Sequence, residues 1–439
     1  MGERALVVGF GVTGRAVSRA LRAEGYEVVV SEDRPDAGLA EETAEADVDL
    51  LASPTADELA RAVRAAALVV PSPGVPASHR VYGMADAAGV PVVSEVELAW
   101  RRASMPVLAV TGTNGKTTVT TLVADMLNQS GRRAIAAGNI GLPLIEAVAR
   151  DVDVVVAEVS SFQLQYTDRF RPSVAVWLNL AEDHLDWHPT LEHYAAAKAR
   201  IWANQADDDL AVVNADDHAV LSAAAAAPAR VQTFAVRSTA DWRVDDGALV
   251  GPAVGRVMAV DELPRRLPHD VSNSLAALAA AVAAGAEVDA CARALRRFAG
   301  LPHRVELVGE SGGVRFFDDS KATTPASVLA ALQGFDSVVL VAGGRNKGLD
   351  LGVLRAEAPR LRAVVAIGDA AAEVEQAFVG VAPVTVATSM DEAVTQARAA
   401  ARPGDVVLLS PGCASFDWYR NYGERGDDFR RAVLEQVGE

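Results

Sequence analysis

Short apolar segments of strand type alternate with amphipathic helical segments rich in alanine and leucine along the whole of this chain. The clearest strand-like segments lie at 5–9, 26–30, 67–71, 107–112, 152–158, 173–179, 210–214, 337–344, 363–368 and 405–412. A helix between two such segments returns the chain to the same edge, so that the next strand runs parallel to the last. The alternation therefore predicts the α/β fold class with mainly parallel sheets.

Two interruptions divide this alternation into three parts. A length of 439 residues allows about three domains. A new strand–turn–helix unit starts at VTGTNGKT, which places the first boundary near 102–105. Glycine and proline follow a long helical segment in FAGLPHRVELV, which places the second boundary near Ala299. We therefore expect domains at 1–102, 103–299 and 300–439.

The composition excludes several classes of protein. A formal net charge of −17 argues against a nucleic-acid partner and against an anionic membrane surface. Two cysteines, Cys291 and Cys413, are too few for a disulfide framework or a zinc site. The N-terminal residues MGERALVVGFG lack the pattern of a signal peptide, and the alanine-rich stretch at 275–295 is too polar to span a bilayer. We therefore expect a soluble cytoplasmic protein without membrane insertion.

Lysine is rare in this chain. Of 41 basic residues, four are lysines: Lys116, Lys198, Lys321 and Lys347. A GC-biased genome replaces lysine by arginine wherever the exchange is harmless, so the retained lysines mark positions where arginine fails. Lysine offers a compact ammonium, or an amine that can lose its proton and react. The four lysines stand in GTNGKTT, YAAAKAR, DDSKATT and AGGRNKG, and we expect these four points to form an active site.

The first motif is GFGVTG, with Gly9, Gly11 and Gly14 directly after the first predicted strand. This GxGxxG pattern forms a tight turn that aims main-chain N–H groups at a diphosphate. Glu32 and Asp33 follow the second predicted strand, where a ribose ligand is expected. The motif alone leaves two interpretations open: an NAD enzyme, or a Rossmann-like domain for another nucleotide diphosphate. The segment PSPGVP (71–76) is either a rim of the same pocket or a turn.

The second motif is VTGTNGKTT, between a predicted strand and a predicted helix. Its spacing, GxxGKT, is two residues shorter than the GxxxxGK(S/T) phosphate loop. In such loops, main-chain N–H groups and the helix N-terminus bind phosphates. We expect Lys116 to contact the terminal phosphates and Thr117 to bind Mg²⁺. The alternative is a chance turn, which the strand–loop–helix context disfavours.

Three further segments carry candidate chemistry. Glu158 ends the segment 152–158, where phosphate-loop folds hold a second Mg²⁺ ligand, although an accidental strand-end carboxylate would look the same. His184 stands among acidic residues in EDHLDWH and suits an Mg²⁺ or substrate contact, whereas His188 is expected to be structural. Lys198 lies within a predicted helix, where a solvated lysine is the alternative interpretation.

Together these segments resemble the Mur ligase superfamily over essentially the whole chain. The linked series is GTNGKTT, NIGLP (139–143), EVSSFQL, EDHLDWH, AAKARIW, GLPHR (300–304), DDSKATT and LSPGCASFDWYRNYGERGDDF. The last four favour the member that adds D-glutamate to UDP-N-acetylmuramoyl-L-alanine, using ATP and an acyl phosphate, in cytoplasmic peptidoglycan precursor synthesis. The resemblance implies an N-terminal Rossmann-like domain for the UDP substrate, a central P-loop-type ATPase, and a C-terminal Rossmann-like domain for D-glutamate. It reassigns GFGVTG from NAD to UDP, and it implies two Mg²⁺ ions and a monomer.

The resemblance also assigns residues by motif. Those for ATP are Gly112, Thr113, Asn114, Gly115, Lys116, Thr117, Thr118, Asn273, Arg304 and Asp319. Those for the UDP substrate are Val12, Thr13, Arg34, Ser72, Gly74, Asn139 and His184. Those for D-glutamate are Lys321, Thr323, Lys347, Ser415, Phe416 and Tyr422. The catalytic residues are Lys116, Glu158, His184 and Lys198, and the metal ligands are Thr117, Glu158, His184 and Lys198.

Lys198 resembles the family's carbamylated lysine. CO₂ attacks only a neutral amine, and the product is an anion that can support Mg²⁺. Because a free lysine has a pKa of ~10.4, burial or nearby metal charge must favour the neutral amine before the reaction. Arginine cannot undergo this chemistry, which explains a retained lysine.

Three departures from the family pattern lie beside these sites. Asp270 stands in HDVSN where HNxxN is usual. Arg345 and Asn346 precede Lys347 where an acidic residue is common, and the glutamate segment has Phe416 and Tyr422 in place of Leu and Phe. These departures bear on the strength of adenine binding and the shape of the glutamate pocket, not on the reaction.

Three rival functions explain less of the sequence. Another Mur ligase or a folylpolyglutamate synthase is disfavoured by SPGCASFDWYRNYGERG and by the lack of a DNPR-like motif for diaminopimelate. An NAD-dependent oxidoreductase leaves the phosphate loop, Glu158 and Lys198 unexplained. A nonenzymatic nucleotide-binding regulator would not need the C-terminal lysines.

Overall fold

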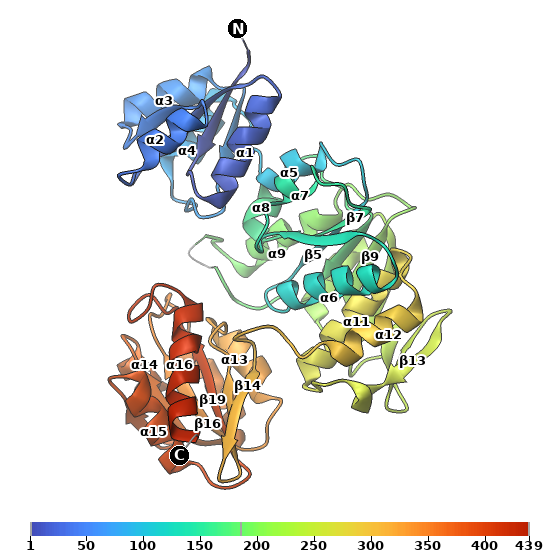
Figure 1. The fold of residues 1–439 in the computed structure, drawn as a ribbon, viewed down its shortest axis with the longest axis vertical. Coiled ribbons are helices and arrows are strands. Elements are labelled where there is room, and N and C mark those ends of the chain that lie inside the picture. Colours follow the sequence, from blue (N-terminus) through green and yellow to red (C-terminus); the bar gives the residue numbers. More distant parts are fainter. Residues whose placement is uncertain (1, 185–186, 438–439) are drawn as a thin grey trace. The chain divides into compact units, whose positions relative to one another are not determined.

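The computed structural model describes residues 2–184 and 187–437. The chain forms two compact units, and each contains parallel β-sheet covered by helices (Figure 1). The first unit comprises Met1–Leu180, His184–Glu262 and Asn273–Arg296, and the second comprises Ala181–Asp183, Leu263–Ser272 and Arg297–Glu439. The α/β fold class is confirmed, while the finer boundaries at 102/103 and 299/300 stay predictions.

The N-terminal sheet has four parallel strands in the order β3-β2-β1-β4. Its elements are β1 (Arg4–Val8), α1 (Val12–Ala23), β2 (Glu27–Glu32), α2 (Leu39–Glu45), β3 (Asp49–Ala52), α3 (Ala56–Ala65), β4 (Leu68–Pro71) and α4 (Arg80–Ala88). Side chains alternate across a strand, so Ala5 and Val7 enter one core cluster while Leu6 and Val8 enter another. Burial on both faces explains the continuous apolar run of β1.

The central sheet has nine strands in the order β13-β12-β11-β10-β9-β8-β5-β7-β6. Its strands are β5 (Val107–Thr111), β6 (Ala134–Gly138), β7 (Val154–Glu158), β8 (Val174–Trp177), β9 (Leu210–Asn214), β10 (Arg230–Ala235), β11 (Trp242–Asp245), β12 (Ala248–Gly251) and β13 (Gly255–Ala259). Pairing is parallel from β6 to β11 and antiparallel from β11 to β13. Because β7 and β8 both pair with β5, the chain segments that leave these three strands start side by side.

The helical segments around this sheet begin with α5 (Glu95–Trp100), which follows the N-terminal sheet. The others are α6 (Lys116–Gln129), α7 (Leu144–Ala147), α8 (Ser161–Gln165), α9 (Leu191–Ala199), η1 (Arg200–Trp202), α10 (His218–Ala223), η2 (Ala224–Ala226), η3 (Val260–Glu262), α11 (Pro268–Ala283) and α12 (Val288–Arg297). Helix α6 starts at the phosphate-loop lysine and packs on β5, β6 and β7.

The C-terminal sheet has six strands in the order β14-β15-β19-β16-β17-β18, parallel except for the β14–β15 hairpin. Its elements are β14 (Glu306–Ser311), β15 (Val314–Asp318), α13 (Pro325–Leu332), β16 (Val338–Gly343), η4 (Leu351–Arg360), β17 (Leu361–Ile367), α14 (Ala371–Phe378), β18 (Val384–Val386), α15 (Met390–Ala400), β19 (Val406–Gly412) and α16 (Tyr422–Val437). Val338 and Leu340 pack with α13 and α14, whereas Val339 and Val341 pack with α15 and α16. Helices therefore cover both faces of the sheet, as in doubly wound folds. Within the described part of the chain, no helix has the length and apolar character needed to cross a bilayer.

Candidate active site

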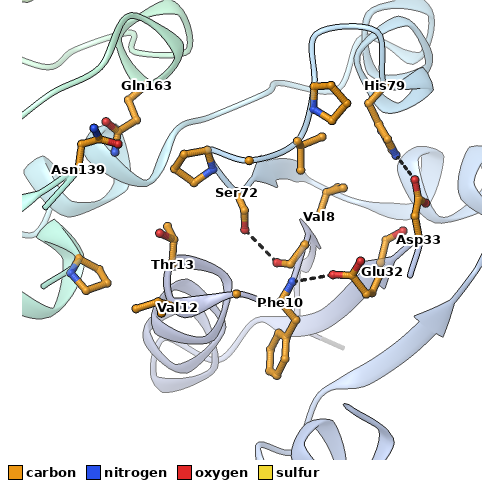
Figure 2. A pocket seen from close by; sticks show the side chains of 18 of the residues that line it. Val8, Phe10, Val12, Thr13, Glu32, Asp33, Ser72, His79, Asn139 and Gln163 are labelled. Atoms are coloured by element: carbon orange, nitrogen blue, oxygen red, sulfur yellow. Dashed lines mark hydrogen bonds and ion pairs between the residues drawn. The ribbon is translucent and has the colours of Figure 1, made fainter. Parts of the chain in front are cut away.

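A pocket of about 730 Å³ opens at the carboxyl ends of β1, β2 and β4 in the first unit (Figure 2). Its lining includes six of the seven residues predicted for the UDP substrate: Val12, Thr13, Arg34, Ser72, Gly74 and Asn139. The seventh, His184, is not among the lining residues. Segments far apart in sequence thus meet at one cavity, at the edge of the sheet where α/β folds bind ligands.

The glycine turn forms one wall of this pocket. Gly9 has a φ of +85°, a conformation that glycine adopts without strain. A Cβ atom on Gly14 would lie 2.1 Å from the carbonyl oxygen of Gly9, so only glycine allows α1 to approach the turn. The Ser72 hydroxyl donates a hydrogen bond to the same oxygen at 2.9 Å, which ties the segment after β4 to the turn.

The acidic residues after β2 shape the pocket through their own partners. The Glu32 carboxylate accepts from the main-chain N–H of Phe10 at 3.2 Å and from that of Arg34 at 3.1 Å. Glu32 therefore fixes the spacing between the glycine turn and Arg34. The Nδ1 atom of His79 accepts from a main-chain N–H, so its Nε2–H donates to Asp33 at 3.1 Å. His79, Phe10 and Gln163 also line the pocket and were not predicted from sequence.

The predicted phosphate loop connects β5 to α6. Gly112 and Gly115 have φ angles of +154° and +83°, and a Cβ atom on Gly115 would lie 2.5 Å from the Asn273 side-chain oxygen. Asn179, which follows β8, accepts from the Asn114 main-chain N–H at 2.8 Å and donates to the Asn114 carbonyl at 3.1 Å. These contacts fix the loop beside the α6 N-terminus, a site that favours anions. In the sequence, Asn179 is the last residue of the strand-like segment 173–179 and has no other distinguishing feature.

The remaining residues predicted for ATP divide between the two units. Thr113 is buried, and Lys116, Thr117 and Thr118 are half-buried in the first turn of α6. The Lys116 ammonium donates to the carbonyl oxygens of Gly112 and Thr113, both at 2.9 Å. Arg304 and Asp319 belong to the second unit.

Glu158 ends β7, and its side chain is 3% exposed. One carboxylate oxygen, Oε1, accepts from the Asn139 side-chain amide at 3.0 Å, and the Glu158 carbonyl accepts from the Asn139 N–H at 2.9 Å. The other oxygen, Oε2, is buried and has no hydrogen-bond partner among residues 2–184 and 187–437. A buried oxygen without a partner costs about 1–3 kcal/mol, which a hard cation would offset. The Glu158 carboxylate therefore fits an Mg²⁺ ligand.

Lys198 is 1% exposed, so the interpretation as a solvated helix lysine is wrong. It is the penultimate residue of α9 rather than a mid-helix residue. Its Nζ donates to the Gly112 carbonyl oxygen at 2.9 Å and lies 4.5 Å from the centre of the Tyr194 ring. The Tyr194 hydroxyl lies 3.4 Å from the Thr113 hydroxyl. The segment of Lys198 and the phosphate loop thus share one site.

The EDHLDWH segment contributes two histidines with different surroundings. His184 has a φ of +56°, and its ring lies edge-on to Phe162 at 4.7 Å between centroids. His188 is fully buried and bonded through its ring nitrogens to Ser161 at 2.9 Å and His193 at 3.0 Å, in agreement with a structural role. Asp186, noted in the same segment, lies outside the described residues.

In the second unit, the Lys321 ammonium lies 3.9 Å from the centre of the Tyr422 ring. This distance is that of a cation–π contact. Ser320 donates to the Tyr422 carbonyl at 2.7 Å and is itself bound through its hydroxyl and its carbonyl by Arg425 at 2.9 and 2.8 Å. Arg425 is 1% exposed, and burial lowers its pKa to about 10. Arg425 could not be predicted from the sequence, since nothing in GERGDD marks it as buried.

Main-chain bonds join the three segments predicted for D-glutamate. The N–H and carbonyl of Arg345 pair with those of Ala414 at 2.8 and 3.0 Å, which sets the Lys347 segment beside the Ser415 segment. The Gly412 N–H donates to Ala322 at 2.9 Å, which adds the segment of Lys321 and Thr323. Ser415 is buried, while Lys347 and Phe416 are exposed.

Asp319 is buried, and Arg304 is half-buried. Burial raises the pKa of Asp319 to about 7, although its carboxylate accepts from the Ser410 hydroxyl at 2.8 Å and from the Val305 N–H at 3.2 Å. Asp270, the departure from HNxxN, pairs with Arg265 at 3.1 Å, and Arg265 donates to the Arg304 carbonyl at 2.6 Å. The carboxylate that replaces the usual amide therefore has a cationic partner.

Comparison with protein families gives three matches in chain order. Residues 3–94 match the "Mur ligase MurD-like, N-terminal domain", residues 110–281 the "Mur ligase middle domain", and residues 303–413 the "Mur ligase, glutamate ligase domain". A UDP-N-acetylmuramoylalanine–D-glutamate ligase of Pelotomaculum thermopropionicum is 43% identical, and the match covers 98% of this chain and 97% of that protein. One of Frankia casuarinae is 46% identical over 99% of this chain and 94% of its own.

Solved structures share the same fold at lower identity. A pseudomurein peptide ligase type C from Methanothermus fervidus has a TM-score of 0.63 and 17% identity, over 99% of this chain and 100% of that one. The UDP-N-acetylmuramate-alanine ligase from Thermotoga maritima has a TM-score of 0.60 and 18% identity, with the same two coverages. The three-sheet α/β architecture is therefore common to these proteins.

Proposed function

The chain belongs to the Mur ligase family, and on this premise we propose that it joins D-glutamate to UDP-N-acetylmuramoyl-L-alanine with ATP as the energy source. The observation that carries the proposal is the presence of two separate nucleotide-type sites in the first unit: the pocket at the glycine turn and the phosphate loop before α6. One site suits a UDP-sugar substrate and the other suits ATP. The choice of D-glutamate is supported by the names of the full-length relatives.

The proposed reaction has two displacements. The substrate carboxylate attacks the γ-phosphorus of ATP, ADP leaves, and an acyl phosphate forms. The amine of D-glutamate then attacks the acyl carbon, the C–O bond to phosphate breaks, and the amine loses a proton. Because two anions must meet in the first step, charge neutralisation is the main task of the protein. Lys116 and the N–H groups at the start of α6 supply it, and the loop holds the phosphates in place.

We propose Thr117, Glu158, His184 and Lys198 as the protein side of a site for two Mg²⁺ ions. The buried, unpartnered Oε2 of Glu158 supports this set. Bound Mg²⁺ would supply charge neutralisation between the phosphates and the substrate carboxylate. The Asn139 amide donates to the other Glu158 oxygen, Oε1, and so leaves Oε2 available to a metal ion.

We propose that Lys198 carries a carbamate. In that reaction the Lys198 ammonium first loses a proton, and the neutral nitrogen then bonds to the carbon of CO₂ and loses a second proton, so that a cation becomes an anion. The burial of this side chain beside the Gly112 carbonyl supports a role in the site and not on the surface. An anionic Lys198 would also attract Lys116, which donates to the same carbonyl.

The D-glutamate pocket is proposed to include Lys321, Thr323, Lys347, Ser415, Phe416 and Tyr422. Lys321 and Lys347 supply two positive charges for the two carboxylates of glutamate. Main-chain hydrogen bonds join the segments that carry these residues, which supports placing them in one pocket. Domains at 1–102, 103–299 and 300–439, a monomeric state and a cytoplasmic location belong to the same proposal.

The test is release of phosphate from ATP by the full-length protein. We expect release that depends on both UDP-N-acetylmuramoyl-L-alanine and D-glutamate, with equal amounts of ADP and amide product. Release that needs only ATP, or that accepts L-alanine or diaminopimelate in place of D-glutamate, would contradict the proposal.

A further inference from the structure

The loop between β6 and α7 forms the wall of the large pocket opposite the glycine turn. Gly138, Asn139, Ile140, Gly141 and Pro143 all line the cavity. Figure 2 shows Asn139 on the side that faces Thr13 and Ser72. The position of this loop therefore sets the width of the pocket.

Two buried carboxylates hold this loop, one at each end. Glu158 binds Asn139 at its start, as described above. At its end, α7 begins at Leu144, and its N-cap residue Pro143 provides no side-chain cap. Glu95, fifty residues earlier in the chain, accepts from the N–H of Ile145 at 2.7 Å and also bonds the N–H of Leu144. Glu95 therefore supplies the cap that the loop lacks.

Glu95 also borders the opposite wall. It is 2% exposed and lines a small cavity together with Ser72, Pro73 and Gln163. Those three residues line the large pocket as well. Glu95 thus binds the loop on one side and shares this small cavity with the segment after β4 on the other.

We propose that Glu95 is a positioning residue for the UDP-substrate pocket: its carboxyl fixes the loop at 138–143 and thereby the contacts of that loop with the substrate. This inference rests on the proposed function of the pocket. Glu95 is not among the residues that line the pocket, so it acts on the substrate through the loop.

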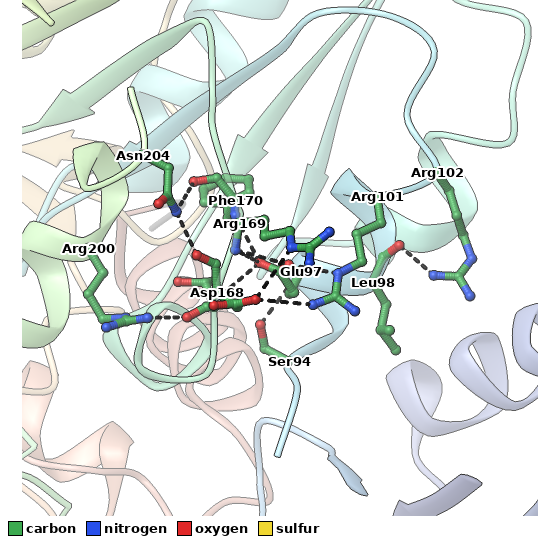
Figure 3. A network of polar contacts seen from close by, with 11 residues as sticks. Ser94, Glu97, Leu98, Arg101, Arg102, Asp168, Arg169, Phe170, Arg200 and Asn204 are labelled. Carbon is green, nitrogen blue, oxygen red and sulfur yellow. Dashed lines mark hydrogen bonds and ion pairs between the residues drawn. The ribbon is translucent and has the colours of Figure 1, made fainter. Parts of the chain in front are cut away.

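Glu97 provides a matched control on the same helix (Figure 3). It is fully buried, and its carboxylate accepts from the N–H groups of Asp168, Arg169 and Phe170 at 2.9–3.1 Å and from Arg101 at 2.8 Å. None of these residues lines the pocket. Glu97 therefore has the same side chain, helix and burial as Glu95, but it holds a different loop.

The experiment compares Glu95→Leu, Glu95→Gln and Glu97→Leu in the full chain by calorimetric titration with UDP and with ATP. We expect Glu95→Leu to weaken UDP binding by about tenfold or more, the scale of losing two buried hydrogen bonds. Glu95→Gln should stay within about threefold of wild type, because the amide oxygen still accepts from Ile145. Glu97→Leu should leave the UDP affinity within about twofold, and ATP affinity should change in none of the three.

Thermal denaturation of each variant separates positioning from loss of fold. Should Glu95→Leu not fold, Glu95→Asp replaces it: the shorter side chain keeps the carboxyl but withdraws it from Ile145, and UDP affinity should again fall. UDP affinity equal to wild type in a folded Glu95 variant, or equal losses for UDP and ATP, overturns the inference. A wild-type protein that does not bind UDP overturns the assignment of the pocket, and the inference with it.

Discussion

Lys116 and Lys198 donate to one acceptor, the main-chain carbonyl oxygen of Gly112, each at 2.9 Å. Two ammonium groups that share one oxygen repel each other, and burial of Lys198 strengthens the repulsion because few water molecules screen it. Conversion of one amine into an anion turns this repulsion into attraction. The shared carbonyl therefore gives a local physical reason for a carbamate at Lys198.

Lys198→Arg should reduce ligation by at least about 100-fold although the positive charge is kept, since guanidinium forms no carbamate. Lys198→Ala should recover part of its activity when short carboxylates such as formate or acetate are added, since they can occupy the vacated space. Steady-state rates with and without added carboxylate measure both effects. Activity of Lys198→Arg near that of wild type would show that the anion is not required.

The pocket at the glycine turn should bind uridine diphosphate and not NAD. Arg34, Ser72 and Asn139 place polar side chains around a cavity whose size suits part of a UDP-sugar, and the phosphate loop for ATP lies elsewhere in the chain. Calorimetry on the intact protein with UDP and with NAD gives the comparison. Micromolar binding of NAD without binding of uridine nucleotides would restore the oxidoreductase interpretation.

Strand prediction succeeded where both faces of a strand are buried. All ten expected segments are strands, with ends within two residues, and β9 (Leu210–Asn214) matches its predicted range. The strands β3 and β18 were not predicted because they are short, lie at sheet edges and are partly exposed. The antiparallel strands β11 to β13 also escaped prediction, since half-exposed strands lack a continuous apolar run.

Motifs supplied the candidate site residues but not their partners. The phosphate loop, Glu158 and the retained lysines all have distinctive local sequences, and the structure gathers Lys116 and Lys198 at one carbonyl. Arg425 and Glu95 have no such signal. In the sequence they are ordinary charged residues of helices, and only tertiary packing buries them against main-chain partners.

Glu95→Gln should change how stability depends on pH. Burial raises the pKa of Glu95 to about 7, from an ordinary value of 4.5. Below about pH 4.5 the carboxyl is neutral in both the folded and the unfolded chain. Between about pH 4.5 and 7 the unfolded chain ionises first, so the wild type loses stability as pH rises, by up to about 3 kcal/mol. Glutamine does not titrate, so the Glu95→Gln variant does not lose this part of its stability as pH rises.

Urea denaturation of wild type and Glu95→Gln at pH values from about 4 to 8 measures this difference. We expect the free energy of unfolding of the variant to rise relative to wild type across that window and then to level off. Other titrating groups cancel because both proteins contain them. A difference that does not vary with pH would show that Glu95 ionises equally in the folded and unfolded chain.

Tyr422 should act on D-glutamate binding through Lys321, whose ammonium lies over its ring. Tyr422→Phe keeps the aromatic face and should leave the KM for D-glutamate within about twofold. Tyr422→Leu removes the cation–π contact and should raise this KM by about threefold to tenfold, with the KM for ATP unchanged. Equal effects of the two substitutions would assign the role to the hydroxyl group or to packing.

Amine-selective labelling should report almost entirely on the active site, because only four lysines and the N-terminal amine react. In the ligand-free protein, exposed Lys347 should label fastest and buried Lys198 slowest. ATP should protect Lys116, and D-glutamate or product should protect Lys321 and Lys347, since the proposed carboxylate contacts cover these amines. Mass spectrometry of samples with ATP alone, with both substrates and with product separates these effects from closure of the protein around ATP. If Lys321 and Lys347 label at the same rate in every state, the D-glutamate pocket is not at these residues, and their retention as lysine needs another explanation.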